Sequence, residues 1–144
     1  MNTVQSNEAD LRHRIDTLAQ AIRDKNVDDV MAHYAPDIVV YDLTPPLDVH
    51  SADEYRKNCE RWFASMPGPI DYQVRDLRVS LSESHAFTHW VGHVTGTRES
   101  GEKADYWVRT TTCFQKANGQ WLVAHEHISM PIDEQGRAAR NQKP

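Results

Sequence analysis

The second half of the sequence gathers imidazole, guanidinium and carboxylate side chains that could move protons or bind an anion. The run His125-Glu126-His127 places two histidines two residues apart, and histidine is the side chain whose ordinary pKa lies nearest to neutral pH. Arg109 follows Trp107 by two residues in a largely apolar stretch. A guanidinium in such a stretch needs a carboxylate or a bound anion. These residues indicate proton transfer or anion binding, with a purely structural ion pair of Arg109 as the alternative.

Asp42 is a second candidate, because it ends an apolar run just before two prolines. A carboxylate at this place is either a turn former or a group that faces a pocket. In an apolar pocket its pKa would rise toward the range that is useful for proton transfer. We therefore expect Asp42 or His127 to carry a proton and Arg109 to anchor or polarise an oxygen atom.

A metal site is a weaker alternative for the histidines. His125 and His127 share one face of a strand, His89 lies on another strand, and imidazole binds zinc and iron. Glu126 is expected to point to the opposite face, so no carboxylate joins them. The preferred hypothesis contains no metal.

Hydrophobic periodicity predicts the elements of the first half. Apolar residues at steps of three and four over 8–25 predict an amphipathic helix. Asn26 is expected to cap a short second helix, which includes Tyr34 and is ended by Pro36. A strand is expected over 38–43, and a capping box beginning at Ser51 starts a third helix.

After residue 69 the apolar period changes to two, which predicts four strands in a meander. The apolar positions shift by an odd number near Arg75-Asp76, as a bulge would require. Asn118-Gly119 between two apolar runs predicts a tight hairpin. The expected fold class is α+β, with the helices packed on one face of a curved antiparallel sheet and a cone-shaped cavity at the open end.

Strand alternation predicts which side chains meet in that cavity. Trp121 and Val123 are expected to face the helices, and the same phase turns the polar end of the last strand inward. The expected cavity residues are Tyr41, Asp42, Trp62, His89, Trp107, Arg109, His125, His127 and Ser129. The expected outer face forms a homodimer and consists of Tyr106, Val108, Phe114, Leu122 and Ile128.

Size and charge exclude several classes of protein. The 144 residues suit one domain over 1–144, with a core over about 8–131 and a C-terminal tail over 132–144. The tail is expected to be loose or to reach a partner subunit. The net charge of −5 and the scattered basic residues argue against nucleic acid. Neither a membrane span nor a secretory signal is evident, so we expect a cytoplasmic protein.

The order of elements and two segments resemble a known family. The segments are His33-Tyr-Ala-Pro-Asp37 leading into Tyr41-Asp42, and the closing run Trp107-Val-Arg…Phe114-Gln-Lys…Gly119-Gln-Trp-Leu-Val-Ala-His-Glu-His-Ile-Ser-Met-Pro131. Over about 8–131 the chain resembles the SnoaL-like, ketosteroid-isomerase-like branch of the NTF2-like superfamily, and within it a bacterial stress-response or polyketide-associated group. The resemblance implies a cone with a deep apolar pocket, dimerisation through the outer sheet face and no organic cofactor.

The same resemblance implies a role for Asp42, which matches the aspartate that moves a proton next to a carbonyl in ketosteroid isomerases. Leu18 or Ala19 stands where that enzyme has a tyrosine donor. His89, Arg109 or His127 is therefore expected to polarise the carbonyl, which suits an acidic or phosphate-bearing substrate.

The expected function is the binding of a small molecule, with isomerase, cyclase or dehydratase chemistry by acid–base catalysis in an apolar pocket. The alternative is a non-catalytic ligand-binding or dimerisation module, since a fold does not decide its use.

Overall fold

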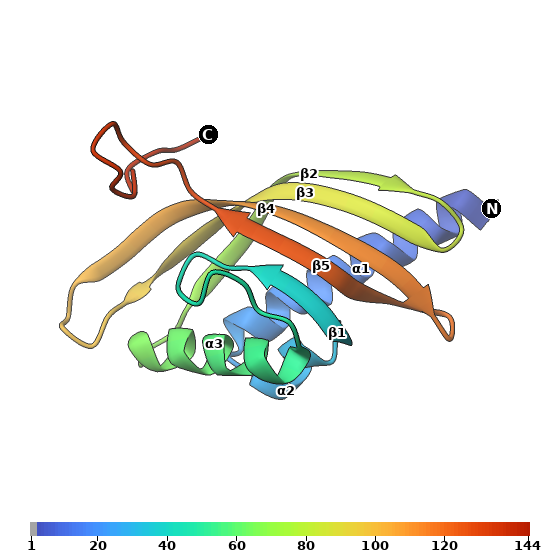
Figure 1. Cartoon of the computed structure of the whole chain (residues 1–144), viewed down its shortest axis with the longest axis horizontal. Coiled ribbons are helices and arrows are strands. Elements are labelled where there is room, and N and C mark those ends of the chain that lie inside the picture. Colours follow the sequence, from blue (N-terminus) through green and yellow to red (C-terminus); the bar gives the residue numbers. More distant parts are fainter. Residues whose placement is uncertain (1–2) are drawn as a thin grey trace.

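Two helices, one strand and a third helix precede four consecutive strands in the chain, which agrees with the predicted α+β class (Figure 1). The structure is a computed structural model that describes residues 3–144, so the first two residues of the predicted domain lie outside it. The elements are α1 (Thr3–Arg23), α2 (Val27–Met31), β1 (Tyr34–Tyr41), α3 (Ala52–Ser65), β2 (Asp71–Leu81), β3 (His85–Thr97), β4 (Lys103–Ala117) and β5 (Gln120–Ser129).

One strongly curved sheet takes the order β1-β5-β4-β3-β2. Strands β2 to β5 form the predicted antiparallel meander, whereas β1 pairs in parallel with β5 at one edge. The three helices lie on the concave side of this sheet (Figure 1). The packed helices and the curved sheet together form the predicted cone.

Local sequence signals explain where the helices begin. The Asn26 side chain accepts a hydrogen bond from the backbone of Asp29 and caps α2. Ser51 accepts from the backbone of Glu54 at 3.2 Å and caps α3. The Glu54 carboxylate in turn accepts from the backbone N–H of His50 at 3.0 Å, one residue before the cap. On α1 the predicted apolar stripe is buried against the sheet.

Pro36 does not end a helix, contrary to the prediction. Tyr34 is the first residue of β1, and Pro36 lies within that strand. The strand tolerates a proline because β1 is at the edge of the sheet and needs no backbone donor on its outer side. Its pairing with β5 is irregular between Tyr34 and Val39.

Two irregularities set the phase of the strands. In β2 the register shifts between Arg75 and Arg78, which confirms the predicted bulge. In β5 a second, unpredicted bulge places one extra residue, Ala124, between the residues that pair with Cys113 and Phe114. Because of this residue, the inward positions of β5 change from odd to even numbers.

The chain after β5 folds back instead of forming the loose tail that we expected. Ile132 pairs with Ala138 in a β-bridge, and Ala139 N–H donates to the carbonyl of Pro131 at 2.8 Å. Asp133 pairs with Arg137 at 3.1 Å. Residues of this segment, Ile132, Ala138 and Arg140, lie in the wall of the cavity between sheet and helices. Among residues 3–144, no helix has the length and the apolar character that crossing a membrane requires.

Candidate functional site

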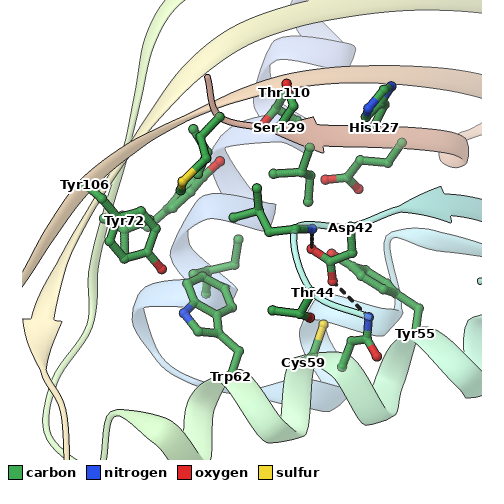
Figure 2. A pocket seen from close by; sticks show the side chains of 18 of the residues that line it. Asp42, Thr44, Tyr55, Cys59, Trp62, Tyr72, Tyr106, Thr110, His127 and Ser129 are labelled. Atoms are coloured by element: carbon green, nitrogen blue, oxygen red, sulfur yellow. Dashed lines mark hydrogen bonds between the residues drawn. The ribbon is translucent and has the colours of Figure 1, made fainter. Parts of the chain in front are cut away.

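A cavity of about 800 Å³ lies between the concave face of the sheet and helices α1 and α3. Its apolar walls include Ile15 and Ala19 of α1, Trp62 of α3 and Val108 of β4. Figure 2 shows Trp62 and Tyr106 on one side of this space and Asp42 and Tyr55 on the other. A concave, mostly apolar space of this size can enclose a small organic molecule.

Glu126 of β5 is the buried carboxyl group of the cavity wall. Its side chain is only 4% exposed. The Tyr34 hydroxyl donates a hydrogen bond to Oε2 at 2.5 Å, while Oε1 accepts none from residues 3–144. Burial raises the pKa of Glu126 to about 7, against the lowering effect of the Tyr34 hydrogen bond, and the charge of Asp42 raises it further. Glu126 can therefore take up and release a proton near neutral pH.

Tyr34 and Tyr55 form the support behind Glu126. Their rings lie 5.0 Å apart between centroids. Burial raises the pKa of both phenols well above the ordinary value, so both remain proton donors. Burial also raises the pKa of the neighbouring Cys59 to about 12, which leaves the thiol protonated and a poor nucleophile.

Asp42 lies in the loop after β1, where the backbone and α3 fix its carboxylate. Oδ1 accepts from the backbone N–H of Leu43 at 2.7 Å, and Oδ2 accepts from Asn58 at 3.0 Å (Figure 2). Arg61 donates to the Asn58 side-chain oxygen and so orients the amide. The cavity thus contains two carboxyl groups in unlike surroundings, one buried against tyrosines and one held by amide donors.

The other side of the cavity carries hydrogen-bond donors. Burial raises the pKa of the Tyr106 hydroxyl, while the Trp62 side chain and the charges of Arg98 and Arg140 lower it. The Trp62 indole N–H is itself buried without a hydrogen-bond partner among the described residues. Tyr72 accepts a hydrogen bond from the Trp90 indole at 2.9 Å, which fixes a further phenol in the wall.

The predicted phase of β4 is wrong. Its inward positions carry even numbers, so Val108 and Phe114 are buried on the concave side, whereas Trp107 and Arg109 lie on the convex side. Arg109 is exposed there, and its Nε donates to Ser129 Oγ at 3.2 Å. Trp107 stacks on His93 with 4.1 Å between ring centroids. Water on the outer face solvates Arg109, which removes the need for a carboxylate or a ligand.

The histidines also fail to converge on the cavity. His125 contacts the carbonyl of Val39 at 2.6 Å, and the exposed Tyr41 lies edge-on between the rings of His125 and His127. His89 is exposed on the outer face of β3. Within residues 3–144 no three potential metal ligands cluster, so these histidines form no metal site. Glu126, expected to point away, faces inward because of the extra residue in β5.

Four of the expected cavity residues therefore lie in its wall and five do not. The wall contains Asp42, Trp62, His127 and Ser129, although the ring of His127 is exposed and contacts Tyr41. The residues outside the wall are Tyr41, His89, Trp107, Arg109 and His125. Most of the set expected on the outer face is also inward, namely Tyr106, Val108, Phe114 and Ile128. The homodimer stays a prediction, but these residues can no longer form its interface on the outer face.

Sequence reasoning missed Glu126, Tyr34 and Tyr55, although one signal was available. Along β5 the large apolar residues change from odd positions at Trp121 and Val123 to an even position at Ile128. The same kind of shift predicted the bulge in β2. Applied to β5, it would have placed Glu126 on the inner face.

A curved sheet closed by helices around an acid-lined apolar cavity defines a class of small cavity proteins. Residues 11–133 match the family described as the SnoaL-like domain. The chain belongs to this family, and its fold is NTF2-like. None of the curated proteins matches the chain.

Solved structures with the same fold differ widely in sequence. An NTF2-like protein of unknown function from Pseudomonas putida KT2440 is 30% identical, with a TM-score of 0.88 over 97% of this chain and 98% of that chain. A candidate scytalone dehydratase from Novosphingobium aromaticivorans is 15% identical, with a TM-score of 0.81 over 99% of this chain and 98% of that chain. A candidate calcium/calmodulin dependent protein kinase II association domain from Xanthomonas campestris is 25% identical, with a TM-score of 0.72 over 81% and 83%.

Proposed function

We propose that this protein is a small-molecule enzyme of the isomerase or dehydratase type that moves a proton from carbon by acid–base catalysis in the cavity. The observation that carries the proposal is Glu126, a buried carboxyl group in the wall of an apolar cavity, with one oxygen free and a pKa of about 7. An effective general base has its pKa near the working pH. The dehydratase named among the structural neighbours agrees with this class.

The proposed catalytic cycle gives each donor and acceptor of the cavity wall one role. Glu126, as carboxylate, takes a proton from a carbon next to a carbonyl, and Tyr106 donates a hydrogen bond to the carbonyl oxygen as it gains negative charge. Glu126 then returns the proton to another carbon, for isomerisation, or to a leaving hydroxyl, for dehydration. Tyr34 keeps the carboxyl group oriented throughout. Asp42 tunes the pKa of Glu126 through its charge.

The reaction of 5-nitrobenzisoxazole tests this base without knowledge of the natural substrate. A base removes the ring C–H proton, the N–O bond breaks, and a coloured cyanophenolate is released. We expect the protein to accelerate this reaction, and Glu126→Gln to lower kcat/KM by about a hundredfold or more. The rate should rise with pH through about 7, as Glu126 loses its proton.

Asp105→Asn is the matched control for this experiment. Asp105 is a carboxylate on the outer face that contacts His93 at 2.7 Å, so its loss should leave the rate within about twofold. A Glu126→Gln variant that stays folded and keeps the wild-type rate would refute the proposal.

Two further variants should shift the pH profile in opposite directions. Tyr34→Phe removes a hydrogen bond that lowers the pKa of Glu126, so the midpoint moves to higher pH. Asp42→Asn removes a charge that raises this pKa, so the midpoint moves to lower pH. Shifts in the same direction, or none, would show that neither residue acts through Glu126.

The second candidate function is a non-catalytic carrier of small molecules. The same cavity supports it, and its mark is ligand binding without any Glu126-dependent proton transfer. Multi-angle light scattering measures the expected homodimer separately, because neither candidate function requires it.

A further inference from the structure

Three arginines line the cavity without a carboxylate partner. Arg61 belongs to α3, Arg98 directly follows β3, and Arg140 belongs to the segment after β5. Within residues 3–144 none of them forms an ion pair. Arg61 donates to the amide oxygen of Asn58, whereas the side chains of Arg98 and Arg140 form no hydrogen bond with the described part of the chain. The last two guanidinium groups are therefore free to bind a ligand.

Arg98 and Arg140 line the same cavity although they are far apart in the sequence. Both charges lower the pKa of the same group, the Tyr106 hydroxyl. Backbone contacts hold the two segments. Glu99 N–H donates to the carbonyl of Ser65 at the end of α3, at 3.3 Å, and Ala139 N–H donates to Pro131 at 2.8 Å. Both cations thus belong to folded segments that line the same cavity.

The two carboxyl groups of the cavity accept hydrogen bonds from neutral donors and do not pair with the arginines among residues 3–144. Asp42 accepts hydrogen bonds from Leu43 and Asn58, and Glu126 accepts one from Tyr34. Although the whole chain carries a net charge of −5, the lining sets Arg61, Arg98 and Arg140 against only Asp42 and Glu126, so positive charge is in excess in the cavity. Guanidinium groups bind carboxylate, sulfonate and phosphate oxygens through pairs of hydrogen bonds. An apolar cavity that ends in two free guanidinium groups suits an apolar molecule with one anionic group.

We propose that the cavity selects amphipathic anions, with the apolar body between sheet and helices and the anionic group held by Arg98 and Arg140. As a statement about the substrate, this inference rests on the proposed function, and as a statement about binding it does not. It also moves the expected anion partner from Arg109, on the outer face, to two arginines that the sequence analysis had not selected.

Two naphthalene dyes that differ by one sulfonate test the selection. We would titrate the protein with 8-anilinonaphthalene-1-sulfonate and with N-phenyl-1-naphthylamine, and use competition between them to establish that they share a site. The sulfonate should bind about tenfold more tightly or better. An Arg98→Gln, Arg140→Gln double variant should lose this preference while keeping its affinity for the uncharged dye.

Arg137→Gln is the control, because Arg137 belongs to the same segment but pairs with Asp133 at 3.1 Å and does not line the cavity. The Arg98→Lys, Arg140→Lys variant should keep part of the preference, which guards against misfolding of the double glutamine variant. Equal affinity of the wild type for both dyes, or a preference unchanged in the double variant, overturns the inference. If the double variant loses the preference for the sulfonate, but Glu126→Gln leaves the rate with 5-nitrobenzisoxazole unchanged, only the proposed function is refuted.

Discussion

The two faces of the sheet give polar side chains opposite surroundings, since one face buries them and the other exposes them to water. On the concave face Glu126 is buried, and its pKa rises to about 7. On the convex face Arg109, His89 and Asp105 are exposed, and Arg109 and Asp105 form ordinary surface contacts with Ser129 and His93. Adjacent residues of one strand alternate between these surroundings, so a shift of one position decides whether a side chain is reactive or merely solvated.

The largest expected effect is on the free energy of unfolding. Measuring it would sharpen the comparison between the concave and convex faces. In the unfolded chain Glu126 ionises near 4.5, and in the folded chain near 7. Between these pH values the folded state holds the extra proton, so the free energy of unfolding falls as pH rises and then levels off above about 7. Glu126→Gln avoids this loss. Between about pH 5 and pH 8 its free energy of unfolding should rise by about 3 kcal/mol relative to that of the wild type.

Urea unfolding of the two proteins at several pH values measures that difference. Asp105→Asn again serves as the outer-face counterpart and should change the pH dependence little. Parallel curves for Glu126→Gln and the wild type would mean that Glu126 is not buried as a protonated acid.

A smaller effect is expected from the inner-face glycine Gly92. A Cβ atom at this position would lie 2.7 Å from the Tyr72 hydroxyl oxygen. Gly92→Ala should therefore displace Tyr72, strain its hydrogen bond with Trp90 and cost about 1–3 kcal/mol. A Cβ atom at Gly68 would meet no other atom within 4 Å, so Gly68→Ala should be neutral or slightly stabilising. Equal melting temperatures for the two variants would show that the inner wall yields easily.

The smallest effect is expected at Arg109, which the sequence analysis had placed in the cavity. Arg109→Gln removes an exposed guanidinium and one hydrogen bond to Ser129. Stability should change by less than about 0.5 kcal/mol, and the rate with 5-nitrobenzisoxazole should stay within about twofold. A large loss of rate would break the distinction between the two faces, since it would give the convex side a part in catalysis.

The order of elements was predictable because each depends on local signals. The capping box at Ser51 and the Asn118-Gly119 hairpin were confirmed, the latter with φ values of 52° and 76°. The shape of the fold followed from the element order, and the family from the resemblance. Asp42 and Trp62 lie in the cavity wall.

The face of each strand was not predictable in the same way. Alternation divides β4 into two sets but does not say which set is inward, and the tryptophan beside Arg109 favoured the wrong one. The site also depends on long-range contacts. Tyr34 meets Glu126 only because β1 pairs with β5, and no local pattern indicates that pairing. Pro36, interpreted as a helix stop, concealed the strand that carries Tyr34.

The parallel contact of β1 with β5 has a consequence for biosynthesis. Tyr34 and Glu126 are separated by 92 positions, and the strand that carries Glu126 is the last to be translated. Forming so distant a contact requires closure of a long loop, which makes it a late event in folding. We therefore expect β1 to stay unpaired while the meander assembles, and the surroundings that raise the pKa of Glu126 to form only when β1 pairs with β5 at one edge of the sheet.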